Sequence, residues 1–244
     1  MSAFDVLKQS VHFYRLLFSK IILISTVSNA LPLLFGAGQS EMPLPLVAFI
    51  LLSSVFCTAW LMVFVHRFSQ YQDSSLKASA SMALEKLFPL LLTFIVMGFA
   101  LTIFSLPAAI FGALLGSGLQ DETAKTGLML LCMLIPILFL SYRWFLAPYA
   151  TLVDGLQPLE AIKRSNRQVR SQPLLLRGFI LVSVIMAIYT LMIIVLQLMI
   201  AVNPVLIEIA KFAVNVVVGP IITIYVYRLF EVTRPSESGD ARHD

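Results

Sequence analysis

Charged side chains are scarce in this sequence, and their scarcity is its most informative property. Only 12% of the 244 residues are charged and 59% are hydrophobic. Soluble domains average about 25% charged and about 45–50% hydrophobic residues. A chain this apolar needs a solvent other than water, so we expect an all-α integral membrane protein. The net charge of +4 gives no reason to expect a nucleic-acid partner.

Residues that serve catalysis or metal binding are also few. Cys57 and Cys132 lie in apolar runs, where a thiol acts as a small hydrophobic group. His12, His66 and His243 lie near charged ends without a close partner in sequence. The chain has no HExxH motif, no glycine-rich phosphate loop and no GxSxG motif. We therefore expect no enzymatic activity, no metal and no cofactor.

Long apolar runs take up most of the chain. A helix needs about 20 apolar residues to cross a bilayer core, and six runs are suitable: 20–37, 45–66, 88–106, 127–149, 175–200 and 208–230. They predict a single membrane domain over residues 1–232 with six transmembrane helices. The remaining residues, 233–244, are polar without an apolar pattern, which predicts a disordered tail.

Two boundaries of these runs need a choice. The apolar stretch 88–118 is too long for one straight crossing, and we place a break at Pro107. Residues 108–118 then either extend the third span or lie at the outer interface. The first run follows a long charged stretch, which favours an uncleaved helix over a signal peptide.

Basic residues fall almost entirely on one side of this arrangement. Of the 17 lysines and arginines, all but Lys125 and Lys211 belong to the two termini, the second connection, the fourth connection and the adjoining span ends. Because lysine and arginine accumulate on the cytoplasmic side, we expect both termini in the cytoplasm.

The segment 159–173 is the most basic part of the chain. As a helix it places Leu159, Ile162 and Val169 on one arc, with four basic residues beside them: Lys163, Arg164, Arg167 and Arg170. This pattern predicts a helix in the membrane interface with its basic flank toward anionic lipid. The segment has no interleaved aromatic residues, which argues against nucleic-acid binding.

Two further segments have the same amphipathic pattern. We expect interfacial helices over 2–18, with the apolar face Phe4, Leu7, Val11, Tyr14 and Phe18, and over 74–87, with the face Leu76, Ala80, Ala83, Leu84 and Leu87. Ser2 and Asp5 have the spacing of a capping box. The chain thus consists of three units, each an interfacial helix followed by two spans.

The sixth expected span carries three polar residues on one face: Glu208, Lys211 and Asn215. Ionisable groups inside a membrane are candidates for function, so this face is either a groove for a lipid headgroup or small solute, or a structural feature. In the structural interpretation, which we prefer, Glu208 pairs with Lys211 and Asn215 bonds another helix. Ser25 and Asn29 are either the partners of Asn215 or bond to their own backbone.

A row of small residues follows Pro107, namely Ala108, Gly112 and Gly116. Small residues let helices approach closely. We expect this row to pack against a helix of the same chain, the alternative being a dimer face.

The stretch FLAPYATLVDGLQPLEAIKRS, residues 145–165, resembles the segment after the fourth span in the YciC family of bacterial inner-membrane proteins. A similar pattern occurs in the membrane region of some glycerophosphodiester phosphodiesterases. The resembling features are Ala147-Pro148, Val153-Asp154-Gly155, Pro158-Leu159-Glu160-Ala161 and Arg164-Ser165. The resemblance implies a location in the bacterial inner membrane and implies no reaction.

Two functional classes are compatible with this sequence. We expect a non-catalytic membrane protein that organises lipid or supports a partner complex in the bacterial envelope. Its partners would be lipids, anionic on the cytoplasmic face, and a membrane protein or a second copy of the chain. The alternative is a small transporter or lipid-moving protein that uses the polar face of the sixth span.

Overall fold

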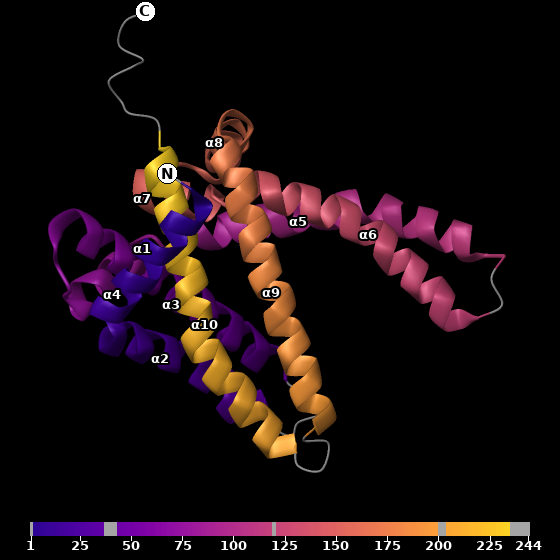
Figure 1. Cartoon of the computed structure of the whole chain (residues 1–244), viewed down its shortest axis with the longest axis horizontal. Coiled ribbons are helices and arrows are strands. Elements are labelled where there is room, and N and C mark those ends of the chain that lie inside the picture. The colour runs from indigo at the N-terminus through magenta and orange to yellow at the C-terminus, as the bar shows by residue number, and fades with distance from the viewer. Residues whose placement is uncertain (1, 37–42, 119–120, 200–203, 235–244) are drawn as a thin grey trace, which may run out of the picture. The chain divides into compact units, whose positions relative to one another are not determined.

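A computed structural model describes residues 2–36, 43–118, 121–199 and 204–234, and its ten helices account for nearly all of them (Figure 1). The described residues contain no strand. The helices are α1 (Ala3–Leu16), α2 (Phe18–Gly36), α3 (Leu44–Tyr71), α4 (Leu76–Glu85), α5 (Leu87–Gly116), α6 (Glu122–Trp144), α7 (Ala147–Asp154), α8 (Pro158–Ser171), α9 (Pro173–Met199) and α10 (Pro204–Thr233).

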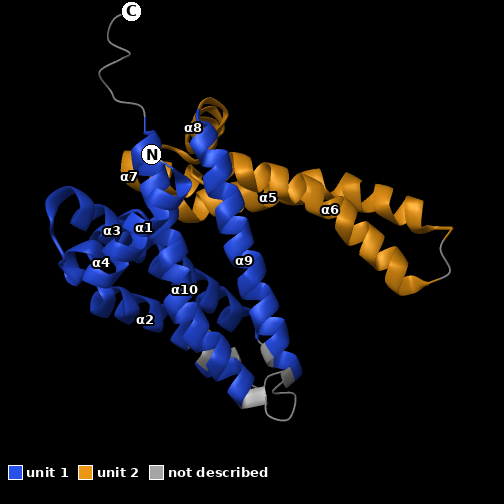
Figure 2. Cartoon of the chain, in the orientation of Figure 1, with its two compact units in different colours: residues 1–88, 172–244 blue, residues 89–171 orange. Residues whose placement is uncertain are grey.

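The helices group into two compact units (Figure 2). Unit 1 comprises residues 1–88 and 172–244, and unit 2 comprises residues 89–171. The sequence suggested one domain over 1–232, because each apolar run looks like the next and nothing in their pattern says which helices pack together. The expected disordered tail, apart from Thr233 at the end of α10 and Arg234, lies outside the described residues.

Five stretches of the described chain are long and apolar enough to span a membrane: Leu44–Tyr71, Leu87–Gly116, Glu122–Asp154, Pro173–Val195 and Leu206–Thr233. Such helices indicate a membrane-embedded protein. A sixth span is counted only if α1 and the first part of α2, which meet at a bend of 90°, form one broken span. The expected count of six therefore depends on this bent pair.

The expected break at Pro107 is wrong. Helix α5 continues from Leu87 to Gly116 with Pro107 inside it. A proline removes one backbone hydrogen bond, and helices in apolar surroundings tolerate that loss when their remaining bonds are kept. Residues 108–116 thus extend the third span, and at about 1.5 Å per residue this helix of about 45 Å exceeds a bilayer core of about 30 Å.

Helix α10 is at the centre of unit 1, where it packs against α1, α2, α3 and α9. Its second half buries several large side chains: Ile224, Tyr225, Tyr227, Leu229 and Phe230. On the neighbouring α9, Gly178 has no side chain, and an added Cβ atom would lie 2.5 Å from Leu229 Cδ1. The absent side chain at Gly178 therefore lets α9 and α10 approach closely.

The expected capping box starts α1. Ser2 Oγ accepts a hydrogen bond from the Asp5 backbone N–H, and the Asp5 carboxylate accepts one from the Ser2 backbone N–H at 2.8 Å. These bonds hold the pKa of the Asp5 carboxyl below its usual range. At the other end of α1, Leu17 leaves helical geometry and the chain turns into α2.

Each apolar face expected for the three short amphipathic helices is buried only in part. Tyr14, Ala83 and Val169 are buried, whereas Phe4, Leu84 and Leu159 are 57–63% exposed. Each of these helices also buries a serine completely: Ser10, Ser79 and Ser165. The serine hydroxyls donate to backbone carbonyls at 2.7–2.9 Å. A small side chain with a satisfied hydroxyl allows close packing between helices, whereas large apolar side chains are compatible with a lipid surrounding.

Unit 2 is held together by short contacts between its helices. Thr93 of α5 and Thr151 of α7 are both buried, and their hydroxyls are 3.0 Å apart. Helix α7 ends at Gly155, whose φ of 67° favours glycine. The Asp154-Gly155 pair therefore makes the turn into α8.

The small-residue row of α5 lies against α6. A Cβ atom added to Gly112 would lie 2.7 Å from Met129 Cα, and one added to Gly116 would lie 3.3 Å from Lys125 Cα. Ala108, one turn before Gly112, is half-buried. In this structure the two glycines thus pack within one chain.

We predict that Gly112→Ala destabilises the protein by about 1–3 kcal/mol, because the new methyl group meets a backbone atom that cannot rotate away. Gly98→Ala in the same helix is the matched control. An added Cβ there has no neighbour within 4 Å, so its effect should stay below about 1 kcal/mol. Unfolding in mixed micelles by circular dichroism measures both. Equal effects of the two substitutions would contradict the close approach of α5 and α6.

Candidate functional site

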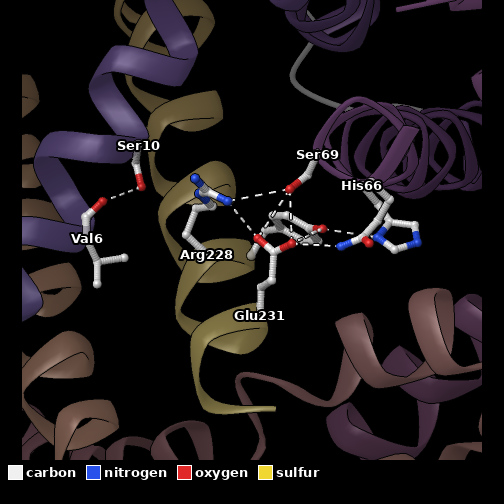
Figure 3. Close-up of polar contacts among 8 residues, drawn as sticks. Val6, Ser10, His66, Ser69, Arg228 and Glu231 are labelled. Atoms are coloured by element: carbon white, nitrogen blue, oxygen red, sulfur yellow. Dashed lines mark hydrogen bonds and ion pairs between the residues drawn. The ribbon is translucent and has the colours of Figure 1, made fainter. Parts of the chain in front are cut away.

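A polar network joins α3 and α10 in unit 1. The Glu231 carboxylate accepts hydrogen bonds from Ser69 Oγ at 3.0 Å and Gln70 Nε2 at 2.8 Å. Arg228, one turn earlier on α10, donates to the same carboxylate at 2.7 Å. Figure 3 shows Arg228 and Glu231 turned toward Ser69. The carboxylate is thus surrounded by donors from two helices, which fixes their register at this end.

His66 extends this network along α3. Its Nδ1 atom is 3.1 Å from the Tyr227 hydroxyl, and the two rings meet edge to face. The Tyr227 hydroxyl in turn donates to Glu231 at 3.4 Å. No partner of His66 could be predicted from the sequence, because Tyr227 is 161 residues away. The one feature of the sequence that could have indicated this network is that His66, Ser69 and Gln70 share one face of their helix.

Beside this network lies a groove of about 490 Å³ between α1, α3 and α10. Its described walls contain basic, neutral polar and apolar side chains and no acidic one. They are Lys8, Gln9, His12, Phe13, Leu16, Phe68, Ser69, Gln72 and Arg228. The Phe13 and Phe68 rings are 5.3 Å apart, and the Arg228 guanidinium lies 5.8 Å from the Phe13 ring. This combination suits an amphiphile with a negative headgroup.

Helix α1 forms the outer wall of the groove. It is fixed to α10 by the buried Tyr225 hydroxyl, which donates to the Ala3 carbonyl at 3.2 Å. Within α1, Ser10 donates to the Val6 carbonyl at 2.7 Å, as Figure 3 also shows. The Tyr225 and Ser10 hydroxyls are thus satisfied where α1 packs, and Lys8 of α1 and Arg228 of α10 both line the groove.

The four basic residues singled out in α8 do not act alike. Three of them, Lys163, Arg167 and Arg170, are exposed and line an open hollow of about 510 Å³ in unit 2. The fourth, Arg164, turns away and pairs with Asp154 at 3.2 Å. Among the described residues, Asn166 and Ser171 also line this hollow.

A second arginine of unit 2 is also held internally. Arg143 of α6 donates to Asn166 Oδ1 at 2.8 Å, and its guanidinium lies 4.8 Å from the Phe139 ring. Asn166 lies on the same arc of α8 as Leu159, Ile162 and Val169, and this bond gives its polar side chain a partner. The paired arginines fix α8 to its neighbours, while the three remaining cations stay available to a ligand.

The polar face expected on the sixth span divides in two. Glu208 and Lys211 form a pair at 2.7 Å, with side chains 42% and 27% exposed. Asn215 accepts a hydrogen bond from the Tyr189 hydroxyl of α9 at 2.5 Å. Ser25 and Asn29 are therefore not the bonded partners recorded for Asn215, although all three line one cavity. Glu208 and Lys211 are not among the residues recorded along that cavity.

Within the described ranges, no group of three histidine, cysteine or acidic side chains could hold a metal ion. Cys57 and Cys132 are both free thiols. No family model, curated protein or solved structure matches this chain.

We predict that Glu231→Gln destabilises the protein by about 1–3 kcal/mol, because it leaves the partly buried Arg228 without its counter-charge. Glu208→Gln is a matched control, since Glu208 forms an ion pair of the same 2.7 Å length and the same i,i+3 spacing on the same helix. The loss there should stay below about 1 kcal/mol, because the pair is more exposed and has no bond to a second helix. Denaturant titration in micelles compares the two, and a larger effect at Glu208 would contradict the role assigned to the network.

Proposed function

We propose that this protein is a multi-pass protein of the bacterial inner membrane that binds anionic lipid along its cytoplasmic face and so organises lipid or supports a partner complex there. The observation that carries the proposal is the hollow of α8. Lys163, Arg167 and Arg170 face it together, and no acidic side chain is recorded along it.

The distribution of ion pairs supports the orientation. Lys125 and Lys211, the two basic residues expected on the outer side, each pair with an acid three residues earlier, at 2.6 and 2.7 Å. The exposed cations of the α8 hollow have no such partner among the described residues. Unpaired positive charge is therefore retained on the side where anionic lipid headgroups attract it.

The groove beside α1 is a second place for an anionic headgroup. It presents Lys8 and His12 together with the Phe13 and Phe68 rings, and it is also lined by Arg228, whose charge Glu231 compensates. A lipid phosphate fits Lys8, and the adjoining acyl ester region fits the aromatic rings. Unit 1 thus has the groove beside α1 and unit 2 has the hollow of α8. The proposal needs no contact between the units.

We predict that the triple variant Lys163→Gln, Arg167→Gln, Arg170→Gln retains anionic lipid roughly a hundredfold less well, at about 1 kcal/mol per basic residue. The measurement is native mass spectrometry of protein released from nanodiscs that contain phosphatidylglycerol and phosphatidylcholine. The folded state should persist, because all three side chains are exposed.

The matched control is Arg15→Gln, Lys77→Gln, Arg177→Gln, which removes the same charge at exposed positions that line neither basic hollow. It should retain phosphatidylglycerol like the unchanged protein. Equal losses in the two variants would reduce the effect to net charge and refute a site on α8. Loss of a co-purified protein, with lipid retention unchanged, would assign the α8 hollow to a partner instead.

A further inference from the structure

A small polar cavity lies among α2, α3 and α10 in unit 1. Its volume is about 170 Å³, and its described walls are Ile24, Ser25, Ser28, Asn29, Cys57, Thr58, Leu61, Asn215, Gly219, Pro220 and Thr223. Thr58 lies near the midpoint of α3 and Gly219 near the midpoint of α10. The cavity therefore lies near the middle of these helices, at the level where hydrocarbon surrounds a spanning protein, and it is partly open, since Gly219 in its wall is exposed.

The walls offer both hydrogen-bond donors and acceptors. Asn29 Nδ2 donates to the Ser25 carbonyl at 2.8 Å, and Thr58 Oγ1 donates to the Ser54 carbonyl at 2.8 Å. These local bonds use donors and leave the side-chain oxygens of Asn29 and Thr58 as acceptors. Asn215 offers donors instead of acceptors, because its side-chain oxygen accepts a hydrogen bond from Tyr189 and its amide N–H groups remain as donors.

The backbone of α10 lacks one helical hydrogen bond next to the cavity. Pro220 lines the cavity and carries no N–H, so the helical hydrogen bond that would reach the Val216 carbonyl is missing. Unsatisfied polar groups are costly in hydrocarbon, and they persist where they line a cavity that holds a partner.

None of the recorded wall residues carries a charge at neutral pH. An ion at this depth would lose its hydration without a counter-charge, which costs several kcal/mol. An uncharged molecule that both donates and accepts hydrogen bonds meets no such cost. At about 30 Å³ per water in the liquid, the volume corresponds to roughly five water molecules.

We propose that this cavity binds a small uncharged hydrogen-bonding ligand, either a cluster of water molecules or a solute such as a polyol or an amide. The inference goes beyond lipid binding at the membrane surface and does not depend on it. It also replaces the groove expected along Glu208, Lys211 and Asn215, since Asn215 alone of the three lines the cavity.

The two cysteines provide a direct test. Cys57 lines the cavity and is 3% exposed, whereas Cys132 lies on α6 and is more exposed. Cys132→Ser leaves Cys57 as the reporter, and Cys57→Ser leaves Cys132 as its control. Each variant is reconstituted in liposomes and treated with iodoacetamide, which is polar and uncharged, or with N-phenylmaleimide, which is apolar. The ratio of the two rates cancels the intrinsic reactivity of each thiol.

The expected result is an iodoacetamide-to-maleimide ratio about tenfold higher for Cys57 than for Cys132, equivalent to about 1.4 kcal/mol of preferential polar access. Glycerol as a probe solute should then slow the reaction of Cys57 and not that of Cys132 if the cavity takes solutes. A high ratio without protection by glycerol identifies the ligand as water.

Three results would overturn the proposal. Equal ratios for the two thiols mean that the cavity is dry. Protection of Cys57 by sodium chloride but not by choline chloride or glycerol means that the site takes a cation. In the Cys132→Ser background, Ser28→Leu serves as a second variant, because the larger side chain fills the cavity and should lower the Cys57 ratio to that of Cys132. A folded Ser28→Leu protein with an unchanged ratio also contradicts the proposal.

Discussion

The packing of α10 against α1, α2 and α3 is the contact on which the other features of unit 1 depend. The Tyr225 hydroxyl reaches the Ala3 carbonyl across 222 residues of sequence, and both residues are buried. Arg228 and Glu231 continue the same helix into the polar network, and Asn215 forms part of the cavity wall. A shift of α10 along its axis would therefore disturb the network, the groove and the cavity together.

The described basic residues of this protein fall into two groups, those that form an ion pair and those that do not. Arg164, Arg228 and Lys211 are each neutralised by an acid on the same or a neighbouring helix. Paired charges hold helices in register and offer little to a ligand, because their electrostatic field is already compensated. Ligand binding at the surface then rests on the exposed cations of α8, which are recorded along an open hollow without an acid.

Much of the architecture could be predicted from apolar run length alone. Five of the six expected spans, the capping box at Ser2 and the helix of residues 158–171 follow from local rules. Which residues of the short helices pack against the protein could not be predicted in this way, because large apolar residues are equally stable where they face lipid. Ser165 is completely buried, whereas Leu159 is mostly exposed.

The candidate sites were predicted only where a single segment carries them. The basic residues of α8 lie within one stretch, so their grouping was visible, although the pairing of Arg164 with Asp154 was not. The network around Glu231 and the cavity around Thr58 combine helices that are far apart in sequence, and no local pattern brings them together. The cavity also contains no ionisable acid or base, which is the signal that a search for function in a membrane segment uses. Neutral serine, threonine and asparagine are common in spans because they bond to their own backbone. They indicate a site only when three helices place them around a common space, as α2, α3 and α10 do here.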